Sequence, residues 1–148
     1  MKAERFSSAA IVAATALALS TKALSACPEE HIVEARDVQG PEESVGVSIR
    51  ELALVNISPV LAGDVAKRFF ELTVAPGGHV LLHGHGDVQG YAYVLSGEAT
   101  ERRSDCAVAL ERRAGDVATE PKTLSHWWEN TGPDPLILLV SHAVPAQN

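Results

Sequence analysis

The chain has 148 residues, of which 19 are acidic and 12 basic, and its formal net charge at neutral pH is −7. A chain with this much negative charge is not expected to be attracted electrostatically to nucleic acid or to an anionic membrane surface. Its length fits one domain with one hydrophobic core.

Residues 1–26 are predicted to be a signal peptide that lies outside the fold. Lys2 and Arg5 precede an uncharged run, rich in alanine and leucine, from residue 7 to residue 20, which is the pattern of a positive n-region and a short h-region. The run is shorter than the roughly 20 apolar residues that cross a bilayer, so we expect a periplasmic or secreted protein. Cleavage would remove three basic residues and one acidic residue, which takes the net charge to about −9.

Cys27 has two competing interpretations. The segment Leu24-Ser25-Ala26-Cys27 matches a lipobox, in which the cysteine would be lipidated and would anchor a lipoprotein in the membrane. The other use is a disulfide with Cys106, the second of the two cysteines, because two cysteines in an oxidising compartment more often pair than stay reduced. Closing a loop of about 80 residues would stabilise the fold by about 4 kcal/mol in the chain-entropy model.

Residues 27–66 are predicted to form an N-terminal arm and the first strand. Residues 29–44 are polar and contain the turn signal Gly40-Pro41. From Val45 to Ile57 the β-branched residues fall on odd positions, which indicates a strand, although Glu51-Leu52-Ala53-Leu54 leaves a short helix possible.

Residues 67–148 are predicted to form a β-barrel. A strand over residues 67–75 is expected to end at the turn Pro76-Gly77-Gly78, and more short strands follow, separated by turn residues. These strands are expected at residues 79–85, 91–95, 99–103, 107–112, 117–120, 126–130 and 136–142. Many short strands without a long amphipathic helix indicate an all-β sandwich or barrel.

The segment His83-Gly84-His85 is the first candidate site. Side chains two apart on a strand share a face, so His83 and His85 would present two imidazoles side by side. Imidazole is the commonest metal ligand in proteins. The alternative is a pair of ordinary surface or core histidines.

Two segments resemble the two motifs of the cupin family. The first contains Gly77, five residues, His83-x-His85 and a closing Gly97. The second contains Gly115, five residues, Pro121, and then His126 and Asn130 at the family spacing, with Thr123 where the family usually has glycine. The resemblance covers residues 68–140 and implies a small jelly-roll β-barrel with a metal held inside. The chain also looks like exported single-domain cupins that begin near a Cys-Pro and end the second motif with His-Trp-Trp-x-Asn.

The resemblance implies a divalent transition metal (Fe, Mn, Ni, Zn or Cu) bound by His83, His85 and His126. The family usually adds a glutamate four or five residues after the second histidine, and here those positions hold Gln89 and Gly90. The amide oxygen of Gln89 can bind a metal weakly. Gln89 is therefore a candidate for the fourth ligand.

Glu120 is another candidate. It flanks, together with His126, a five-residue loop at residues 121–125, so the two side chains are expected roughly opposite each other on one face of a hairpin. Glu120 could be the fourth ligand, a hydrogen-bond partner that holds an imidazole, or a general acid or base. The alternative is an exposed glutamate at the rim.

Alternation along the strands sorts the aromatic residues. If His126 points inward, so does Trp128, which would line the cavity or fill the core. Tyr91 and Tyr93 share one face of their strand and are candidates for the mouth of the cavity. His142 lies near the end of the chain and is not expected to be a ligand.

Three functions fit these residues. An enzyme would use the open coordination positions of the metal on a small oxygen-rich or phenolic substrate, and the resemblance implies dioxygenase, isomerase or decarboxylase chemistry without selecting one. A binding module would capture a metal or a small ligand without turnover. A metal-free barrel would be structural only. The resemblance also implies a homodimer formed through barrel edges.

Overall fold

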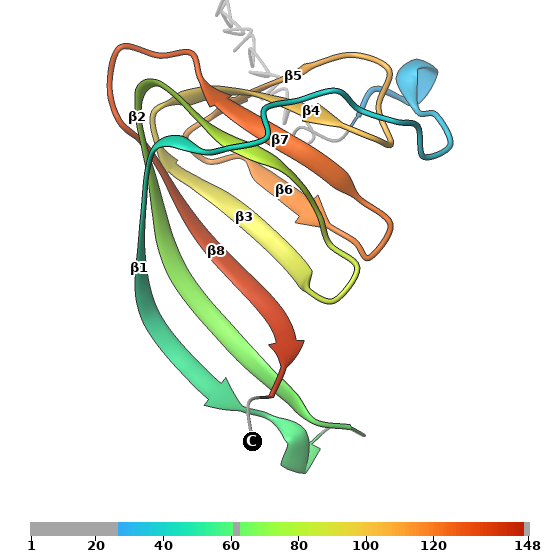
Figure 1. The fold of residues 1–148 in the computed structure, drawn as a ribbon, viewed down its shortest axis with the longest axis vertical. Helices are drawn as coiled ribbons and strands as arrows, with labels where there is room; N and C mark the ends of the chain where they lie inside the picture. The colour runs from blue at the N-terminus through green and yellow to red at the C-terminus, as the bar shows by residue number, and fades with distance from the viewer. Residues whose placement is uncertain (1–26, 61–62, 147–148) are drawn as a thin grey trace, which may run out of the picture.

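The computed structural model describes residues 27–60 and 63–146 (Figure 1). The predicted signal peptide lies outside these residues. Regular structure is nearly all β, as predicted, and no helix within the described ranges is long and apolar enough to cross a membrane. The elements in chain order are η1 (Glu29–His31), β1 (Val45–Asn56), η2 (Ser58–Val60), β2 (Val65–Gly84), β3 (Gln89–Ser96), β4 (Glu98–Arg103), β5 (Leu110–Arg113), β6 (Val117–Glu120), β7 (Ser125–Asn130) and β8 (Leu136–Pro145).

The long strand β2 connects the two halves of a curled antiparallel sheet. Its first half pairs with β1 on one edge and with β8 on the other, and its second half pairs with β7. The order of hydrogen-bonded strands is β5-β4-β7-β2-β8-β3-β6, with β1 added at β2. The strands thus curl around a common interior, in agreement with the predicted jelly-roll barrel (Figure 1).

Several strand boundaries differ from the prediction, and two of the differences have a clear physical reason. Pro76-Gly77-Gly78 does not end a strand, because β2 runs through it and exchanges β8 for β7 as its partner there. A Cβ on Gly78 would lie 2.6 Å from the carbonyl oxygen of Val45, so this glycine lets β1 approach closely. The strand expected at residues 107–112 begins only at Leu110, since the chain just before it carries a disulfide and a bridge to the N-terminal arm.

The hydrophobic core lies between the inner faces of the curled sheet. Alternate residues of β2 point inward and face alternate residues of β8 in register. Trp128 of β7, 2% exposed, packs into the same cluster and points inward as predicted. The three facing pairs are Phe70 with Val140, Leu72 with Leu138, and Val74 with Leu136.

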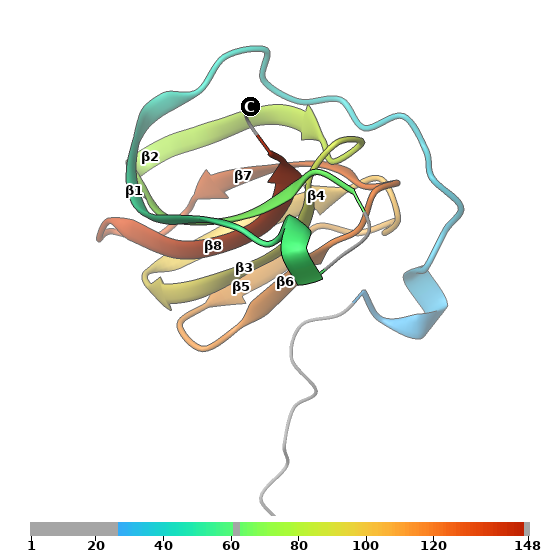
Figure 2. The same cartoon turned by 90° about the horizontal axis from the view of Figure 1, so that it is seen from below.

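The N-terminal arm (residues 27–44) runs along the outside of the sheet from η1 to β1 (Figure 2). The predicted disulfide Cys27–Cys106 ties down its start, with the two Cα atoms 5.7 Å apart. Further along, the indole Nε1 of Trp127 donates a hydrogen bond to the carbonyl of Gln39 at 3.0 Å. Gly40 packs on the same ring, where a Cβ would lie 2.5 Å from Cδ1 of Trp127. A larger residue at position 40 would therefore lift the arm from β7.

Candidate metal centre

Three histidine side chains meet inside the barrel. His83 lies near the end of β2, His85 follows that strand, and His126 is the cross-strand partner of His83 on β7. Nε2 of His126 lies 2.9 Å from Nε2 of His85 and 3.2 Å from Nε2 of His83. His85 and His126 are almost completely buried, whereas His83 is half-buried. The structure thus brings together the three residues that the two motifs nominate.

Hydrogen bonds determine which nitrogen of each ring faces this cluster. Nδ1 of His83 lies 2.9 Å from the carbonyl oxygen of Leu81, and Nδ1 of His126 lies 2.5 Å from a carboxylate oxygen of Glu101. Carbonyl and carboxylate oxygens only accept, so each neutral ring carries its hydrogen on Nδ1 and a lone pair on Nε2. Two lone pairs that face each other at 3.2 Å repel each other unless a cation lies between them.

A divalent metal fits this arrangement. With metal–nitrogen bonds of about 2.0–2.1 Å, two imidazole nitrogens on one ion lie roughly 2.9–3.4 Å apart, and the measured separations are 2.9 and 3.2 Å. Nδ1 of His85 is buried and has no hydrogen-bond partner within the described part of the chain. The buried ring of His85 is therefore not held by a hydrogen bond from Nδ1 to the protein, as expected for a side chain that binds a ligand instead.

Burial keeps two of the histidines in the form that binds metals. Desolvation lowers the pKa of His83, and the neighbouring His126 lowers that pKa further. Desolvation likewise lowers the pKa of His85, to about 4. Because a metal binds the neutral imidazole, both rings are ready to bind at neutral pH and below it.

These lowered pKa values predict a pH-dependent stability for the metal-free protein. As the pH falls below 6.5, the unfolded chain takes up protons on His83 and His85 more readily than the folded chain does. The free energy of unfolding should therefore fall as the pH falls. Urea unfolding at several pH values in the presence of a chelator measures the effect. A His85→Asn variant should show a shallower decline, and equal slopes for the two proteins would contradict the prediction.

Glu120 points into the barrel beside the histidines, as the hairpin argument predicts. Its side chain is 4% exposed, and its Oε1 lies 3.8 Å from Nε2 of His126. Its Oε2 accepts a hydrogen bond from Nε2 of His142 at 2.6 Å. His142, which the sequence analysis does not expect to be a ligand, nevertheless lies beside the site, because the pairing of β8 with β3 and β2 brings it there. His85, Glu120 and His142 form a second group whose ligand atoms lie within 4.8 Å of one another.

The structure corrects the predictions made for the residues of β3. Tyr91 and Tyr93 are 49% and 38% exposed and do not line the cavity, and Gln89 is exposed on the same face. The inward positions belong to smaller residues, and a Cβ on Gly90 would lie 1.8 Å from the carbonyl oxygen of Ser141. Position 90 therefore cannot carry the glutamate usual in the family. Its cross-strand partner is Glu120, so the neighbouring strand delivers a carboxylate to the same region.

Glu101 of β4 is a buried carboxylate that the sequence pattern does not single out. It contacts His126 and is also bound by Arg103 and Arg112. Burial alone would raise the pKa of Glu101, but the hydrogen bond from His126 and the two guanidinium charges lower it to about 2, so the group is ionised. Alternation places Glu101 and Arg103 on one face of a strand, and only the pairing of β4 with β7 shows that this face is the inner one.

A small cavity lies next to the histidines. Its volume is about 50 Å³, and most of its walls are apolar. Three polar side chains, those of His83, Glu120 and His142, reach it among Phe70, Leu72, Val80, Ala92, Trp128, Leu138 and Val140.

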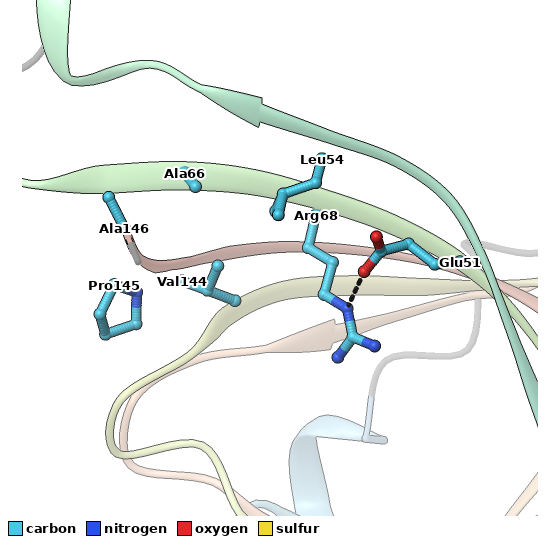
Figure 3. Close-up of a pocket in the computed structure, with 7 residues that line it drawn as sticks. All are labelled: Glu51, Leu54, Ala66, Arg68, Val144, Pro145 and Ala146. Atoms are coloured by element: carbon cyan, nitrogen blue, oxygen red, sulfur yellow. Dashed lines mark hydrogen bonds and ion pairs between the residues drawn. The ribbon is translucent and has the colours of Figure 1, made fainter. Parts of the chain in front are cut away.

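A larger hollow of about 580 Å³ lies near the ends of β1, β2 and β8 (Figure 3). The side chain of Arg68 borders it, with Nε donating to Glu51 at 3.1 Å. The guanidinium lies over the ring of Phe70, 4.6 Å from its centroid. Arg68 is the cross-strand partner of His142, and Phe70 lines the small cavity. The hollow is therefore next to the candidate centre along the inner face of the sheet.

Known proteins share this fold and its motifs. A family model described as "Cupin domain" matches residues 70–142, a range that contains the three clustered histidines, Glu120 and His142. The chain belongs to the cupin superfamily. Within it, this cupin is 34% identical over 106 residues to oxalate decarboxylase OxdC of Bacillus subtilis (strain 168), a match that covers 68% of this chain and 26% of that protein. The cupin thus spans about a quarter of the length of that relative.

Solved structures give the same picture. A predicted oxalate decarboxylase from Thermotoga maritima matches with a TM-score of 0.54 at 22% identity, covering 76% of this cupin and 99% of that chain. At that identity the likeness shows the fold alone. A structure of Bacillus subtilis oxalate decarboxylase, studied for its Mn(II) centres, matches with a TM-score of 0.53 at 27% identity, covering 74% of this cupin and 29% of that chain.

Proposed function

We propose that this cupin is a mononuclear metalloenzyme that acts on a small oxygen-rich molecule. The convergence of three imidazole nitrogens, two of them with lone pairs directed at each other, is the observation that supports the proposal. His83, His85 and His126 would hold a divalent transition metal, and Glu120 would add a charged oxygen ligand through Oε1. Such a donor set of nitrogen and oxygen suits Fe, Mn, Ni, Zn or Cu.

A bound divalent ion would supply Lewis acidity toward an oxygen atom of the substrate. The surrounding residues have separate tasks. His142 holds the second oxygen of Glu120 and so fixes the direction in which the carboxylate points. Phe70, Trp128 and Val140 form apolar walls that exclude water from the cavity. A polar reactant would therefore meet its charged partners in a region of low dielectric, where those interactions are strong.

We propose a small carboxylate as the substrate class within this function. Arg68 supports this choice, since its two terminal nitrogens have no hydrogen-bond partner within the described residues and only its Nε pairs with Glu51. A guanidinium with its terminal nitrogens available matches the geometry of a carboxylate. The relation to oxalate decarboxylase makes oxalate the first compound to test.

Elemental analysis followed by turnover assays tests the proposed function. Natively purified protein should contain about one equivalent of a divalent metal, and the loaded protein should convert at least one compound from a panel of small carboxylates and catechols, followed by carbon dioxide release and oxygen uptake. Arg68→Ala should raise KM for a carboxylate substrate more than it lowers kcat, while Arg50→Ala, at another exposed arginine of the same sheet, should leave both unchanged. Less than about a tenth of an equivalent of metal would contradict the proposal.

A non-catalytic binding module is the second candidate. The small volume of the cavity, about 50 Å³, favours it, because this is room for little more than water beside a bound ion. One equivalent of metal without turnover across the whole panel would support this alternative.

Location and assembly are further parts of the proposal. Export is supported by the signal-like residues 1–26 and by the disulfide, and a Cys27 that is paired with Cys106 is not available for lipidation. Secretion or a periplasmic location is therefore preferred over a lipoprotein anchor. A homodimer is supported by the exposed apolar side chains of Val45, Leu54 and Val55 on β1. Light scattering at several protein concentrations tests this assembly.

A further inference from the structure

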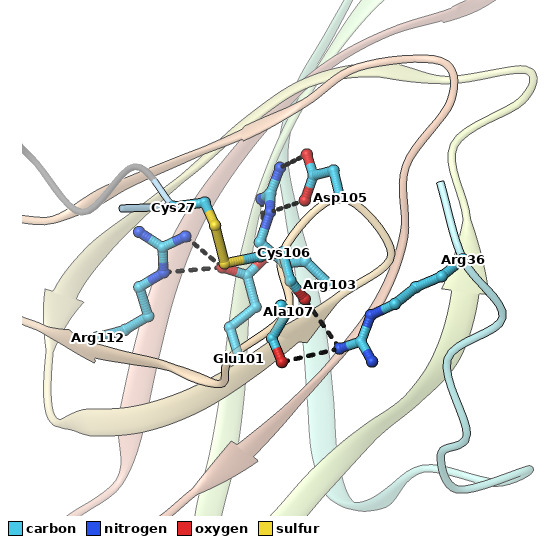
Figure 4. Close-up of a disulfide and its surroundings, with 8 residues drawn as sticks. All are labelled: Cys27, Arg36, Glu101, Arg103, Asp105, Cys106, Ala107 and Arg112. Carbon is cyan, nitrogen blue, oxygen red and sulfur yellow. Dashed lines mark hydrogen bonds and ion pairs between the residues drawn. A yellow bond between two sulfur atoms is a disulfide. The ribbon is translucent and has the colours of Figure 1, made fainter. Parts of the chain in front are cut away.

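Glu101, Arg103 and Arg112 form a buried ion cluster (Figure 4). It lies directly behind His126, one of the clustered histidines. Glu101 is 0% exposed, and one of its oxygens accepts the Nδ1 hydrogen of His126 at 2.5 Å. Both residues lie on paired strands, because β4 lies next to β7. The carboxylate thus contacts the Nδ1 edge of the ring, while Nε2 points at His83 and His85.

Two arginines compensate the charge of this carboxylate. Nη1 of Arg103 donates to Oε1 of Glu101 at 3.0 Å, and Nε of Arg112 donates to Oε2 at 2.8 Å. The guanidinium of Arg103 is itself held by Asp105, at 2.8 and 2.9 Å, and by the carbonyl of Thr119 at 3.0 Å. Each carboxylate oxygen of Glu101 therefore accepts a hydrogen bond from an arginine, so the carboxylate is held in position from two sides.

Burying a cluster of charged side chains in this part of the interior is energetically unfavourable compared with burying apolar ones. Arg103 and Arg112 are 5% and 2% exposed, and moving charges of this kind out of water is unfavourable before any attraction between them is counted. Apolar side chains of similar volume would fill the same space at least as well. A role in stability alone does not account for the cluster, whereas a role in setting the state of His126 does.

We propose that Glu101 is a positioning residue that holds His126 in the one tautomer and orientation that presents Nε2 to a metal. This inference deepens the proposed function and rests on it for the metal, but the fixed tautomer is a property of the metal-free chain as well. The two arginines donate to both oxygens of Glu101 and hold the carboxylate in place, so that it accepts the Nδ1 hydrogen of His126.

The three imidazole rings consequently differ in how strongly their nitrogens can bind a metal. Nδ1 of His126 is hydrogen-bonded to a carboxylate, and Nδ1 of His83 to the carbonyl of Leu81. Nδ1 of His85 has no hydrogen-bond partner within the described residues. A charged acceptor makes an imidazole a stronger base than a neutral acceptor does. His126 is thus the strongest nitrogen donor of the centre, and Glu101 determines that strength.

The experiment compares Glu101→Gln with the unmodified protein in two separate measurements. Nitrogen-15 NMR of the metal-free proteins should show His126 as a single Nδ1–H tautomer in the unmodified chain and as a mixture in the variant. Titration with Zn(II) should show affinity reduced about 10–100-fold in the variant. Glu129→Gln, which removes a partly exposed carboxylate from β7, is the matched control and should change neither result.

The outcomes separate the inference from the proposed function. A Glu101→Gln variant with the same tautomer and the same Zn(II) affinity as the unmodified chain would overturn the inference. If the unmodified chain binds no Zn(II), the proposed function fails, and the NMR comparison alone decides the role of Glu101. If Glu101→Gln does not fold, Glu101→Asp keeps the charge but moves it away from the ring. That variant should weaken Zn(II) binding while remaining folded, and unchanged affinity there would overturn the inference.

Discussion

Replacing His126 by alanine is expected to lower the affinity for a divalent metal by more than about a hundredfold, since loss of an outer hydrogen-bond partner already costs about 10–100-fold and a direct ligand contributes more. The physical reason is geometric, because Nε2 of His126 is the atom that both other imidazoles approach. Metal content after native purification and Zn(II) titration of the stripped protein measure the change.

His79→Ala is the matched control for this prediction. His79 lies on the same strand as His83 and is paired with Glu129 of β7, but it belongs to neither group of potential ligands. Its replacement should leave the metal affinity unchanged. Should His126→Ala prove unfolded by circular dichroism, His83→Ala at the half-buried position takes its place. A folded variant of either kind that still binds metal with full affinity would show that the three rings do not form one site.

Breaking the disulfide is expected to have the largest effect on stability. Cys27→Ser removes the link while leaving the fully buried Cys106 side chain in place, so it isolates the contribution of the cross-link. A loop of 79 residues is opened, which in the chain-entropy model costs about 4 kcal/mol. For a domain of this size that corresponds to a fall in Tm of about 15 °C, measurable by calorimetry.

Reducing agent supplies the control. It should lower the Tm of the unmodified protein by a similar amount and leave the Tm of Cys27→Ser unchanged. If the variant and the unmodified protein melt within about 2 °C of each other, the arm contributes little to the stability of the barrel. The same variant should retain metal binding in the cold, because all three clustered histidines belong to strands or loops of the barrel itself.

The sequence was sufficient for those parts of the site that are local along the chain. His83 and His85 are two residues apart, and the spacing of the second motif identifies His126. Glu120 could be placed because it flanks a short loop with His126. The inferences about His83, His85 and Glu120 depend on the period of a strand or the length of a hairpin, which are properties of a few neighbouring residues. The role of His126 was implied by the resemblance to the second cupin motif.

The parts that the sequence did not reveal depend on how distant strands pair. Glu101 and Arg103 have the composition of a solvated strand, and only the pairing of β4 with β7 turns them inward. His142 is near the C-terminal end, yet β8 runs between β2 and β3 and brings it to Glu120. Tyr91 was misplaced because alternation along a strand does not indicate which face is the inner one, and Ala92, 1% exposed, marks the inner face of this strand.

The two adjacent tryptophans report on different regions of the molecule. Trp127 lies under the N-terminal arm, bonded to Gln39, while Trp128 is in the core with its ring centroid 6.1 Å from that of His126. Intrinsic fluorescence of a protein that keeps only Trp127 would follow detachment of the arm. Fluorescence of one that keeps only Trp128 would be quenched when a paramagnetic ion is loaded. Fluorescence from two neighbouring tryptophans could thus follow detachment of the arm and loading of the ion separately and in real time.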